Sequence, residues 1–221
     1  MASRGMLFSA AMVRGLRRAV DPKTQTRRAV KPDPGSDINA IFDDGMWQWA
    51  TVASRRRCPY GAPGDTLWVR ETWAPNLGTA GGYVYRADHG VCASFAKADL
   101  KTGQWTHNTD RWHPSIHMPR VASRITLKIT DVRVERLQAI SEADALAEGI
   151  VATHGGFGLP DGSHFHASDP RISYWSLWDA INGAGAADSN PWVWCVTFEP
   201  ASLCNRRAGR HGLDDQPASR N

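Results

Sequence analysis

The segment Pro191 to Glu199 limits the possible folds more than any other part of the chain, because it is apolar on both sides. Successive side chains of a strand point to opposite faces of its sheet. One face would carry Trp192, Trp194, Val196 and Phe198, and the other would carry Val193 and Cys195. A strand of this kind belongs at the centre of a sheet that is covered on both faces. We therefore expect residues 191–199 to form a central, closing strand with its tryptophans in the core.

A second long strand is predicted for residues 124–134, and its pattern changes parity part-way. Ile125, Leu127 and Ile129 would share one face, whereas Val132 and Val134 have the opposite parity. A β-bulge or corner near Thr130 and Asp131 would return all five side chains to one core. Such bends are common in small closed barrels.

The other predicted elements are shorter. They are helices over residues 6–20, 139–150 and 170–181 and strands over residues 23–30, 66–73 and 83–86. The helix within 139–150 has defined ends, because Ser141 is a natural N-cap, Asp144 completes a capping-box pattern and Gly149 stops the helix. The order of elements favours a mostly β fold with flanking helices, of the α+β class, over a parallel α/β sheet.

A chain of 221 residues suits one domain with insertions better than two small domains. We expect a single domain over residues 1–199, with insertions at about 33–57, 88–120 and 151–169. From Pro200 on, the composition is polar and basic without periodicity. Residues 200–221 are therefore expected to be a disordered basic tail.

Charge and cysteine usage narrow the class of protein. A net charge of +4 is a modest excess that makes an anionic partner such as nucleic acid plausible. The four cysteines are far apart and include no CxxC pair, as expected of reduced thiols.

No apolar run is long enough to span a bilayer, and the arginine-containing N-terminus does not have the pattern of a secretory signal. We expect a cytoplasmic protein without membrane contact.

The basic stretch KTQTRR, Lys23 to Arg28, is the first candidate for chemistry. A lysine three residues before a threonine, at a helix-to-strand turn, can bring amine and hydroxyl together, so that neutral Lys23 takes the proton of Thr26. The positive charges of Arg27 and Arg28 would lower the pKa of Lys23. The alternative is an ordinary basic edge strand, whose charges discourage association between sheets.

Glu148 is the second candidate. It occupies the last turn of its predicted helix, where a negative charge opposes the helix dipole at a cost of roughly 0.3–1 kcal/mol. A partner cation or a chemical role would account for a carboxylate in this place. A solvated surface glutamate is the alternative.

Trp68 is the best candidate for a base-stacking surface, since it lies on the strand face opposite Leu67 and Val69, with Arg70 on the same face. Stacking on an aromatic ring contributes roughly 1–3 kcal/mol per base. An adjacent arginine can hold a phosphate or a base edge. Alternatively, an insertion covers Trp68 as a second small core. Three further tryptophans could line the same cleft: Trp73, Trp105 and Trp112.

The histidines do not favour a metal site. His113 and His117 are four residues apart, but prolines at 114 and 119 make their segment an irregular loop, and no acid or cysteine cluster completes a ligand set. The glycine-rich phosphate loops and the nucleophile elbow are absent as sequence motifs. We expect neither a metal nor a cofactor.

Four sequence blocks resemble the ASCH family, a branch of the PUA-like superfamily. They are K-T-x-T-x-R at 23–28, P-G-D-x-L-W-V at 63–69, I-T-x-x-I-T-D-V at 125–132 and A-x-A-E-G at 145–149. The shorter stretches CPYG, WVRETW, SIHMPR and NPWVW resemble the larger ASCH-like proteins of phage and prophage genomes. The resemblance implies a small β-barrel with a cleft for nucleic acid or a nucleobase-containing ligand.

One bacterial branch of this family hydrolyses the acetyl amide of N4-acetylcytidine with a lysine, a threonine and a glutamate. These residues match Lys23, Thr26 and Glu148. The resemblance implies that Thr26 attacks the acyl carbon, that Lys23 acts as base and then acid, and that Glu148 orients the lysine. Because a carboxylate raises the pKa of a neighbouring lysine, a charged Lys23 that stabilises an oxyanion is the alternative.

The expected binding residues of this site are Thr24, Arg28, Trp68, Arg70 and Glu71. The expected partner is a modified nucleoside or single-stranded nucleic acid. Other branches of the family are RNA-binding modules or a ribonuclease, so a non-catalytic RNA- or DNA-binding module and a nuclease stay open as alternatives. The insertions, together with Gln25 and Arg27 in the motif, distinguish this chain from the minimal enzyme.

Overall fold

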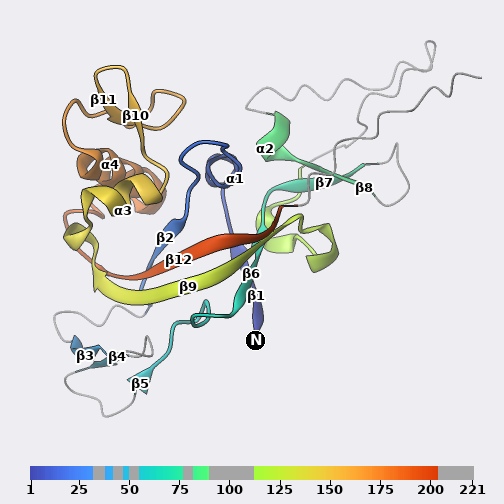
Figure 1. Ribbon diagram of the computed structural model, residues 1–221, viewed down its shortest axis with the longest axis horizontal. Helices are drawn as coiled ribbons and strands as arrows, with labels where there is room; N and C mark the ends of the chain where they lie inside the picture. The colour runs from blue at the N-terminus through green and yellow to red at the C-terminus, as the bar shows by residue number, and fades with distance from the viewer. Residues whose placement is uncertain (32–37, 42–46, 50–54, 77–81, 90–111, 204–221) are drawn as a thin grey trace, which may run out of the picture.

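The computed structural model describes residues 1–31, 38–41, 47–49, 55–76, 82–89 and 112–203, and these form a mixed α+β fold with more strands than helices. A five-stranded sheet with the order β1-β6-β9-β12-β2 is the centre of the molecule (Figure 1). Its members are β1 (Ser3–Leu7), β6 (Thr66–Arg70), β9 (Ile125–Arg136), β12 (Trp192–Leu203) and β2 (Gln25–Ala29). β1 runs parallel to β6, and the other neighbours are antiparallel.

β12 lies between β9 and β2, as its two-sided apolar pattern predicts. On one face Trp194, Val196 and Phe198 belong to the main core, and on the other Val193 belongs to a second core with Tyr174. The strand continues past Glu199 to Leu203, so residues 200–203 are paired with β9 and are not part of the predicted tail. Residues 204–221 lie outside the described part of the chain.

β9 bends where the sequence pattern changes parity. Thr197 pairs with Asp131 and Phe198 pairs with Ile129, so Thr130 is the additional residue of a β-bulge. The bulge lets Ile129 and Val132 reach the same core. The predicted bulge at this place is confirmed.

The predicted helix over residues 6–20 is wrong at both ends. Residues Ser3–Leu7 form edge strand β1, and helix α1 covers only Ala10–Leu16. The hydroxyl of Ser9 caps the helix by accepting a hydrogen bond from the Met12 amide at 3.3 Å. Pairing of β1 with β6 therefore overrides the helical spacing of the first apolar residues.

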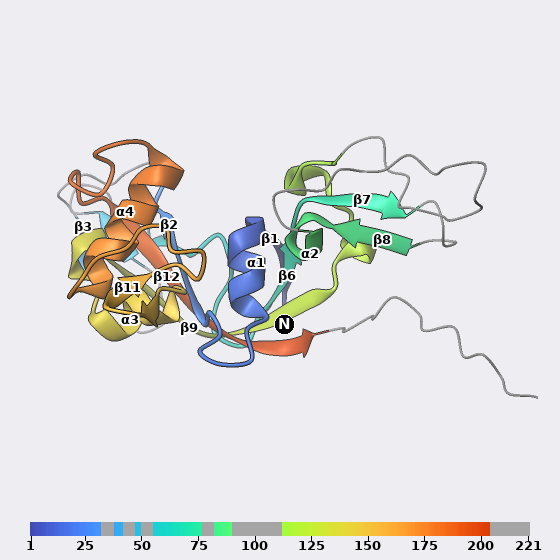
Figure 2. The same cartoon turned by 90° about the horizontal axis from the view of Figure 1, so that it is seen from above.

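The two edges of the sheet, β1 and β2, do not pair with each other among the described residues, so no closed barrel is formed there. A side chain bridges them instead, because Nη2 of Arg28 on β2 donates to the Leu7 carbonyl at the end of β1 at 2.6 Å. Helix α1 lies between β2 on one side and β1 and β6 on the other (Figure 2). Its Val13 and Leu16 are buried in the main core.

The remaining elements flank this sheet. They are β3 (Ile38–Ile41), β4 (Trp47–Trp49), β5 (Arg55–Arg56), β7 (Trp73–Asn76), β8 (Gly82–Tyr85), α2 (Arg86–His89), three 3₁₀ turns (Ser115–His117, Arg120–Ala122, Leu137–Ala139), α3 (Glu142–Ala147), β10 (Val151–Thr153), β11 (Gly156–Gly158) and α4 (Pro170–Asn182). The predicted strand 66–73 is divided between β6 and β7, and the predicted loop 151–169 contains the hairpin β10-β11. Of the insertions predicted at 33–57 and 88–120, a large part lies outside the described residues.

Helix α3 has the ends that its sequence predicts. The Ser141 hydroxyl accepts from the Asp144 amide at 3.1 Å, and Gly149 takes a φ of 110° directly after the helix. α3, α4 and the hairpin β10-β11 gather on one side of α1 (Figures 1 and 2). Within the described ranges, no helix combines the length and apolar character required to cross a bilayer.

Candidate functional site

A cavity of about 320 Å³ lies between α1, α4 and the loop that follows β11. Its apolar wall includes Met12, Leu159, Leu177 and Ile181. Its charged lining residues are Arg14, Arg18, Lys23, Glu148 and Asp161. Small-molecule sites have this character: volumes of roughly 300–1,000 Å³, mainly apolar walls and a few placed polar groups.

Lys23 and Glu148 form a buried ion pair in this cavity. Nζ of Lys23 donates to Oε2 of Glu148 and to its backbone carbonyl, both at 2.5 Å. The side chains are 3% and 4% exposed, so neither charge is solvated by bulk water. Glu148 is the C-cap of α3, where carbonyls lack partners and a negative charge opposes the helix dipole. Lys23 donates to the Glu148 carbonyl and neutralises its carboxylate, which explains how a glutamate is tolerated at this helix end.

The path of the Lys23 side chain depends on two glycines. A Cβ added at Gly15 would lie 3.4 Å from Cβ of Lys23, and one added at Gly149 would lie 3.7 Å from it. Backbone hydrogen bonds fix the approach: the Lys23 amide donates to the Gly15 carbonyl at 3.0 Å, and the Thr24 amide donates to the Ala147 carbonyl at 2.9 Å. The lysine stem therefore passes between the ends of α1 and α3.

Burial lowers the pKa of Lys23 below its usual value. The carboxylate of Glu148 acts in the opposite direction, and the charges of Arg27 and Arg28 add to the lowering. The arginines were expected to lower this pKa, but desolvation is the larger cause. A lysine of this kind can exist as a neutral amine closer to physiological pH than an exposed one.

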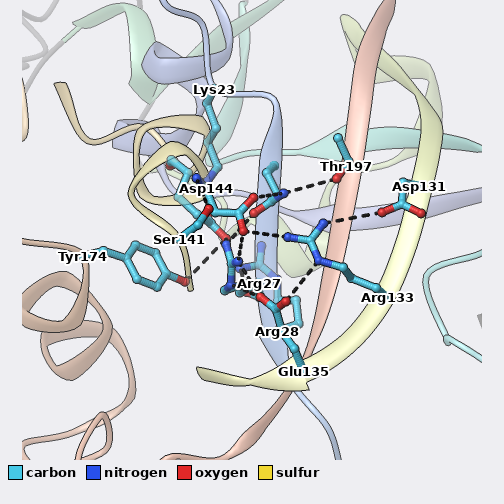
Figure 3. A network of polar contacts seen from close by, with 12 residues as sticks. Lys23, Arg27, Arg28, Asp131, Arg133, Glu135, Ser141, Asp144, Tyr174 and Thr197 are labelled. Carbon is cyan, nitrogen blue, oxygen red and sulfur yellow. Dashed lines mark hydrogen bonds and ion pairs between the residues drawn. The ribbon is translucent and has the colours of Figure 1, made fainter. Parts of the chain in front are cut away.

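Glu148 also contacts Arg27 and Tyr174, and through Arg27 the ion pair is connected to a larger network of charges (Figure 3). Arg27, whose side chain is fully buried, donates to Glu148 at 3.4 Å, to Glu135 at 2.5 Å and to Asp144 at 3.1 Å. Arg133 donates to Asp144 at 2.8 Å, and the Tyr174 hydroxyl donates to Glu148 at 3.5 Å. Three cations therefore face three carboxylates: Lys23, Arg27 and Arg133 against Glu135, Asp144 and Glu148.

Sequence reasoning missed Arg27 and Gln25 as members of the site. Gln25 donates to Asp144 at 3.0 Å and to Thr197 at 3.3 Å. A signal was present, because Lys23, Gln25 and Arg27 alternate along the predicted strand 23–30 and would share one of its faces. Asp144 and Glu148 are four residues apart at the helix that faces them.

Thr26 lies on the other face of β2. It pairs with Val196, whose side chain is in the main core, while the flanking Gln25 and Arg27 point to the network. Thr26 is 1% exposed, and within the described ranges its Oγ1 has no hydrogen-bond partner, so it is not bonded to Lys23. Of the three expected catalytic residues, the structure brings Lys23 and Glu148 together in the cavity lining and does not place Thr26 there.

The expected binding residues lie outside the cavity lining. The carbonyl of Thr24 accepts from the Phe198 amide at 2.8 Å, which fixes the start of β2 against β12. Arg28 bridges the sheet edges and lies over the Phe8 ring, 5.7 Å from its centroid. Both residues therefore fix the position of β2, which directly follows Lys23.

Trp68, Arg70 and Glu71 belong to a separate region around β6. The guanidinium of Arg70 covers the Trp68 ring at 5.3 Å and also donates to the Ile116 carbonyl. The indole lies against Gly5, where an added Cβ would come within 2.6 Å of it. Glu71 is buried and receives two hydrogen bonds from Arg124, at 2.8 and 2.9 Å, so its role here is an internal ion pair.

Of the other expected cleft residues, neither Trp73 nor Trp112 belongs to the cavity lining. Trp73 stacks on His113 with ring centroids 4.9 Å apart, and Trp105 lies outside the described residues. In the part of the chain that is described, no three or more His, Cys, Asp or Glu side chains form a group suited to a metal ion.

A comparison with protein-family models, curated proteins and solved structures finds no match to this chain.

Proposed function

We propose that this chain is an ASCH-like protein of the PUA-like superfamily that binds a modified pyrimidine nucleoside in the cavity and hydrolyses its N4-acyl amide. The observation that carries the proposal is the buried Lys23–Glu148 pair in the lining of a mostly apolar cavity. A lysine whose pKa burial lowers is suited to acid–base chemistry. The bent β9 and the bridge of Arg28 between the sheet edges support the barrel-like fold that the resemblance implies.

In the proposed reaction, neutral Lys23 takes a proton from the nucleophile as the nucleophile attacks the acyl carbon. The carbon–nitrogen bond of the amide then breaks, and the new ammonium of Lys23 returns the proton to the departing cytosine amine. Glu148 orients Nζ in both steps through its 2.5 Å contact. A water molecule in the cavity can serve as nucleophile directly, whereas Thr26 would first have to turn its hydroxyl away from the main core.

The test is turnover of N4-acetylcytidine and other N4-acyl cytidines by the purified protein, followed by chromatography. We expect cytidine and the free acid from the wild type, and none from Lys23→Met. The matched control is Lys128→Met, because Lys128 is an exposed lysine outside the cavity lining that forms a surface ion pair with Glu199. Absence of turnover by the wild type on every amide would reject the enzyme proposal.

The second candidate is a non-catalytic RNA- or DNA-binding module, and the half-exposed Trp68 with its Arg70 partner favours it. A base could stack there if Arg70 left the ring to contact a phosphate. Trp68→Ala would then weaken binding of single-stranded RNA and Arg70→Met would reduce the salt dependence of affinity. Under this proposal Lys23→Met would leave RNA affinity unchanged.

A further inference from the structure

Two arginines in the cavity lining have no carboxylate partner among the described residues. Arg14 and Arg18 both line the cavity, and neither forms an ion pair in the described part of the chain. Arg14 lies in the last turn of α1 and Arg18 follows its C-cap, Arg17, so the end of this helix brings both side chains to the same cavity. The neighbouring Lys23 charge is matched by Glu148. Asp161 and Asp21 act on Arg14 and Arg18 through their fields, but in the described structure neither guanidinium group is held by a carboxylate within ion-pair distance.

The Arg18 guanidinium is held in place before any ligand binds. Its Nε donates to the Gly15 carbonyl at 3.5 Å and its Nη2 donates to the Gly149 carbonyl at 3.2 Å. Its Nη1 is buried and has no hydrogen-bond partner among the residues that the structure describes. An unsatisfied donor on a charged group is unfavourable, so an oxygen acceptor brought to this edge would be bound strongly.

The carboxylates near this wall do not occupy the arginines. Asp161 also lines the cavity, but its Oδ1 accepts hydrogen bonds from the amide and hydroxyl of Ser163, at 3.0 and 2.6 Å. Asp21 acts on Arg18 through its field and is not within ion-pair distance in the described structure. The backbone carbonyls at the end of α1 have donors, since Gly15 accepts from the Lys23 amide.

We propose that Arg14 and Arg18 bind the phosphate group of the ligand, so that the cavity takes a nucleotide in preference to a neutral nucleoside. This inference rests on the proposed function and extends it to the substrate class. A terminal phosphate offers three acceptor oxygens, enough to pair with Arg14 and with the free edge of Arg18 after a small rotation of its guanidinium. The Lys23–Glu148 pair, in the same lining, would then face the base end of the ligand.

The inference is tested by binding, with ligands that cannot be hydrolysed. Calorimetry would compare cytidine, cytidine 5′-monophosphate and inorganic phosphate on the wild type, Arg14→Met, Arg18→Met and Arg120→Met. Arg120 is an exposed arginine outside the cavity lining and is the matched control. Arg14 is also exposed, so its replacement tests the site without the loss of the Arg18 contacts to the backbone.

We expect the monophosphate to bind the wild type and Arg120→Met at least about tenfold more tightly than cytidine. In both cavity variants the ratio of the two dissociation constants should fall toward one. Equal affinity for cytidine and its monophosphate would overturn the phosphate site while leaving a nucleoside enzyme intact. Arg18-dependent binding of inorganic phosphate without any pyrimidine binding would support the phosphate site and reject the proposed function. Short RNA strands with and without a 5′-phosphate would distinguish a free nucleotide from a strand end as the source of the group.

Discussion

At the scale of single residues, Glu148 connects two cations with different roles. Its Oε2 accepts from Lys23 and its Oε1 faces Arg27, so the carboxylate is shared between the cavity and the network behind it. Removing one partner of such a buried set leaves uncompensated charge, which typically costs about 3–5 kcal/mol. Lys23 and Glu148 were predicted from the sequence through the resemblance. Arg27 was not, because its carboxylate partners come from β9 and α3, more than one hundred residues further along the chain.

The two chemical roles of Lys23 make opposite predictions for the pH dependence of activity. If Lys23 is the base, kcat/KM rises with pH through a pKa that burial places below the usual lysine value. Glu148→Gln removes an influence that raises this pKa, so the rising limb should move to lower pH while kcat falls. A profile of kcat/KM measured between pH 5 and 10 on both proteins would show this. If activity instead falls with rising pH over the same range, Lys23 acts as the charged group that stabilises the oxyanion.

Asp144 makes a contribution to the stability of the folded state that depends on pH. Burial raises the pKa of Asp144, but hydrogen bonds from Gln25 and Arg133 outweigh it and bring the value down to about 2. A lowered carboxylate pKa stabilises the folded state above the unfolded pKa, and this stabilisation is lost as the pH falls toward the folded value.

Asp144→Asn should therefore reduce the free energy of unfolding at pH 7 by about 1 kcal/mol, after allowance for solvent screening, and flatten its decline between about pH 4 and pH 2. Urea unfolding at a series of pH values is the measurement. Asp131→Asn is the matched control, since the Asp131 side chain is 54% exposed and its ion pair with Arg133 is long, at 3.5 Å. Equal acid sensitivity of wild type and Asp144→Asn would contradict the argument.

At the scale of elements, the sequence predicted the features that depend on neighbouring residues. The parity change in β9 and the capped ends of α3 can both be recognised from residues close together in the sequence. Both predictions are confirmed. Strand β1 was not predicted, and its last two residues, Met6 and Leu7, were assigned to helix, because its partner β6 begins only at Thr66. The hairpin β10-β11 was missed for a different reason: each strand has only three residues, too few for an alternating apolar pattern, and β11 is Gly-Phe-Gly.

The bulge at Thr130 gives a prediction for β9. Deletion of Thr130 would shift one half of the strand by one residue, so that either Ile129 or Val132 would leave the core. We expect the deletion protein to lose its cooperative thermal unfolding transition. Thr130→Ala is the control and should change the free energy of unfolding by no more than about 0.5 kcal/mol, because Thr130 is exposed. A deletion protein that unfolds cooperatively would show that the bulge is dispensable.

At the scale of the whole molecule, the cavity lies where two cores meet. The main core holds α1 and the inner face of β12, and the second core holds α3 and α4 against the other face of the same strand. Lys23 and the network lie between these cores, which explains how so many charges are buried without weakening either apolar cluster. No local sequence pattern could predict this arrangement, because the cavity is formed by segments from both ends of the chain.

Filling the cavity should separate ligand binding from folding. Ile181 lines the cavity from α4 and is 60% exposed, so Ile181→Trp can enter the cavity without disturbing a core. A ligand that binds only the folded state stabilises it by about 2.7 kcal/mol at one hundred times its dissociation constant. We expect cytidine 5′-monophosphate to raise the melting temperature of the wild type and of Ile172→Trp, which changes the same helix outside the cavity lining. Ile181→Trp should melt at the temperature of the unliganded wild type whether or not the nucleotide is added. If the nucleotide stabilises all three proteins equally, it binds elsewhere, and the cavity between the two cores is not the ligand site.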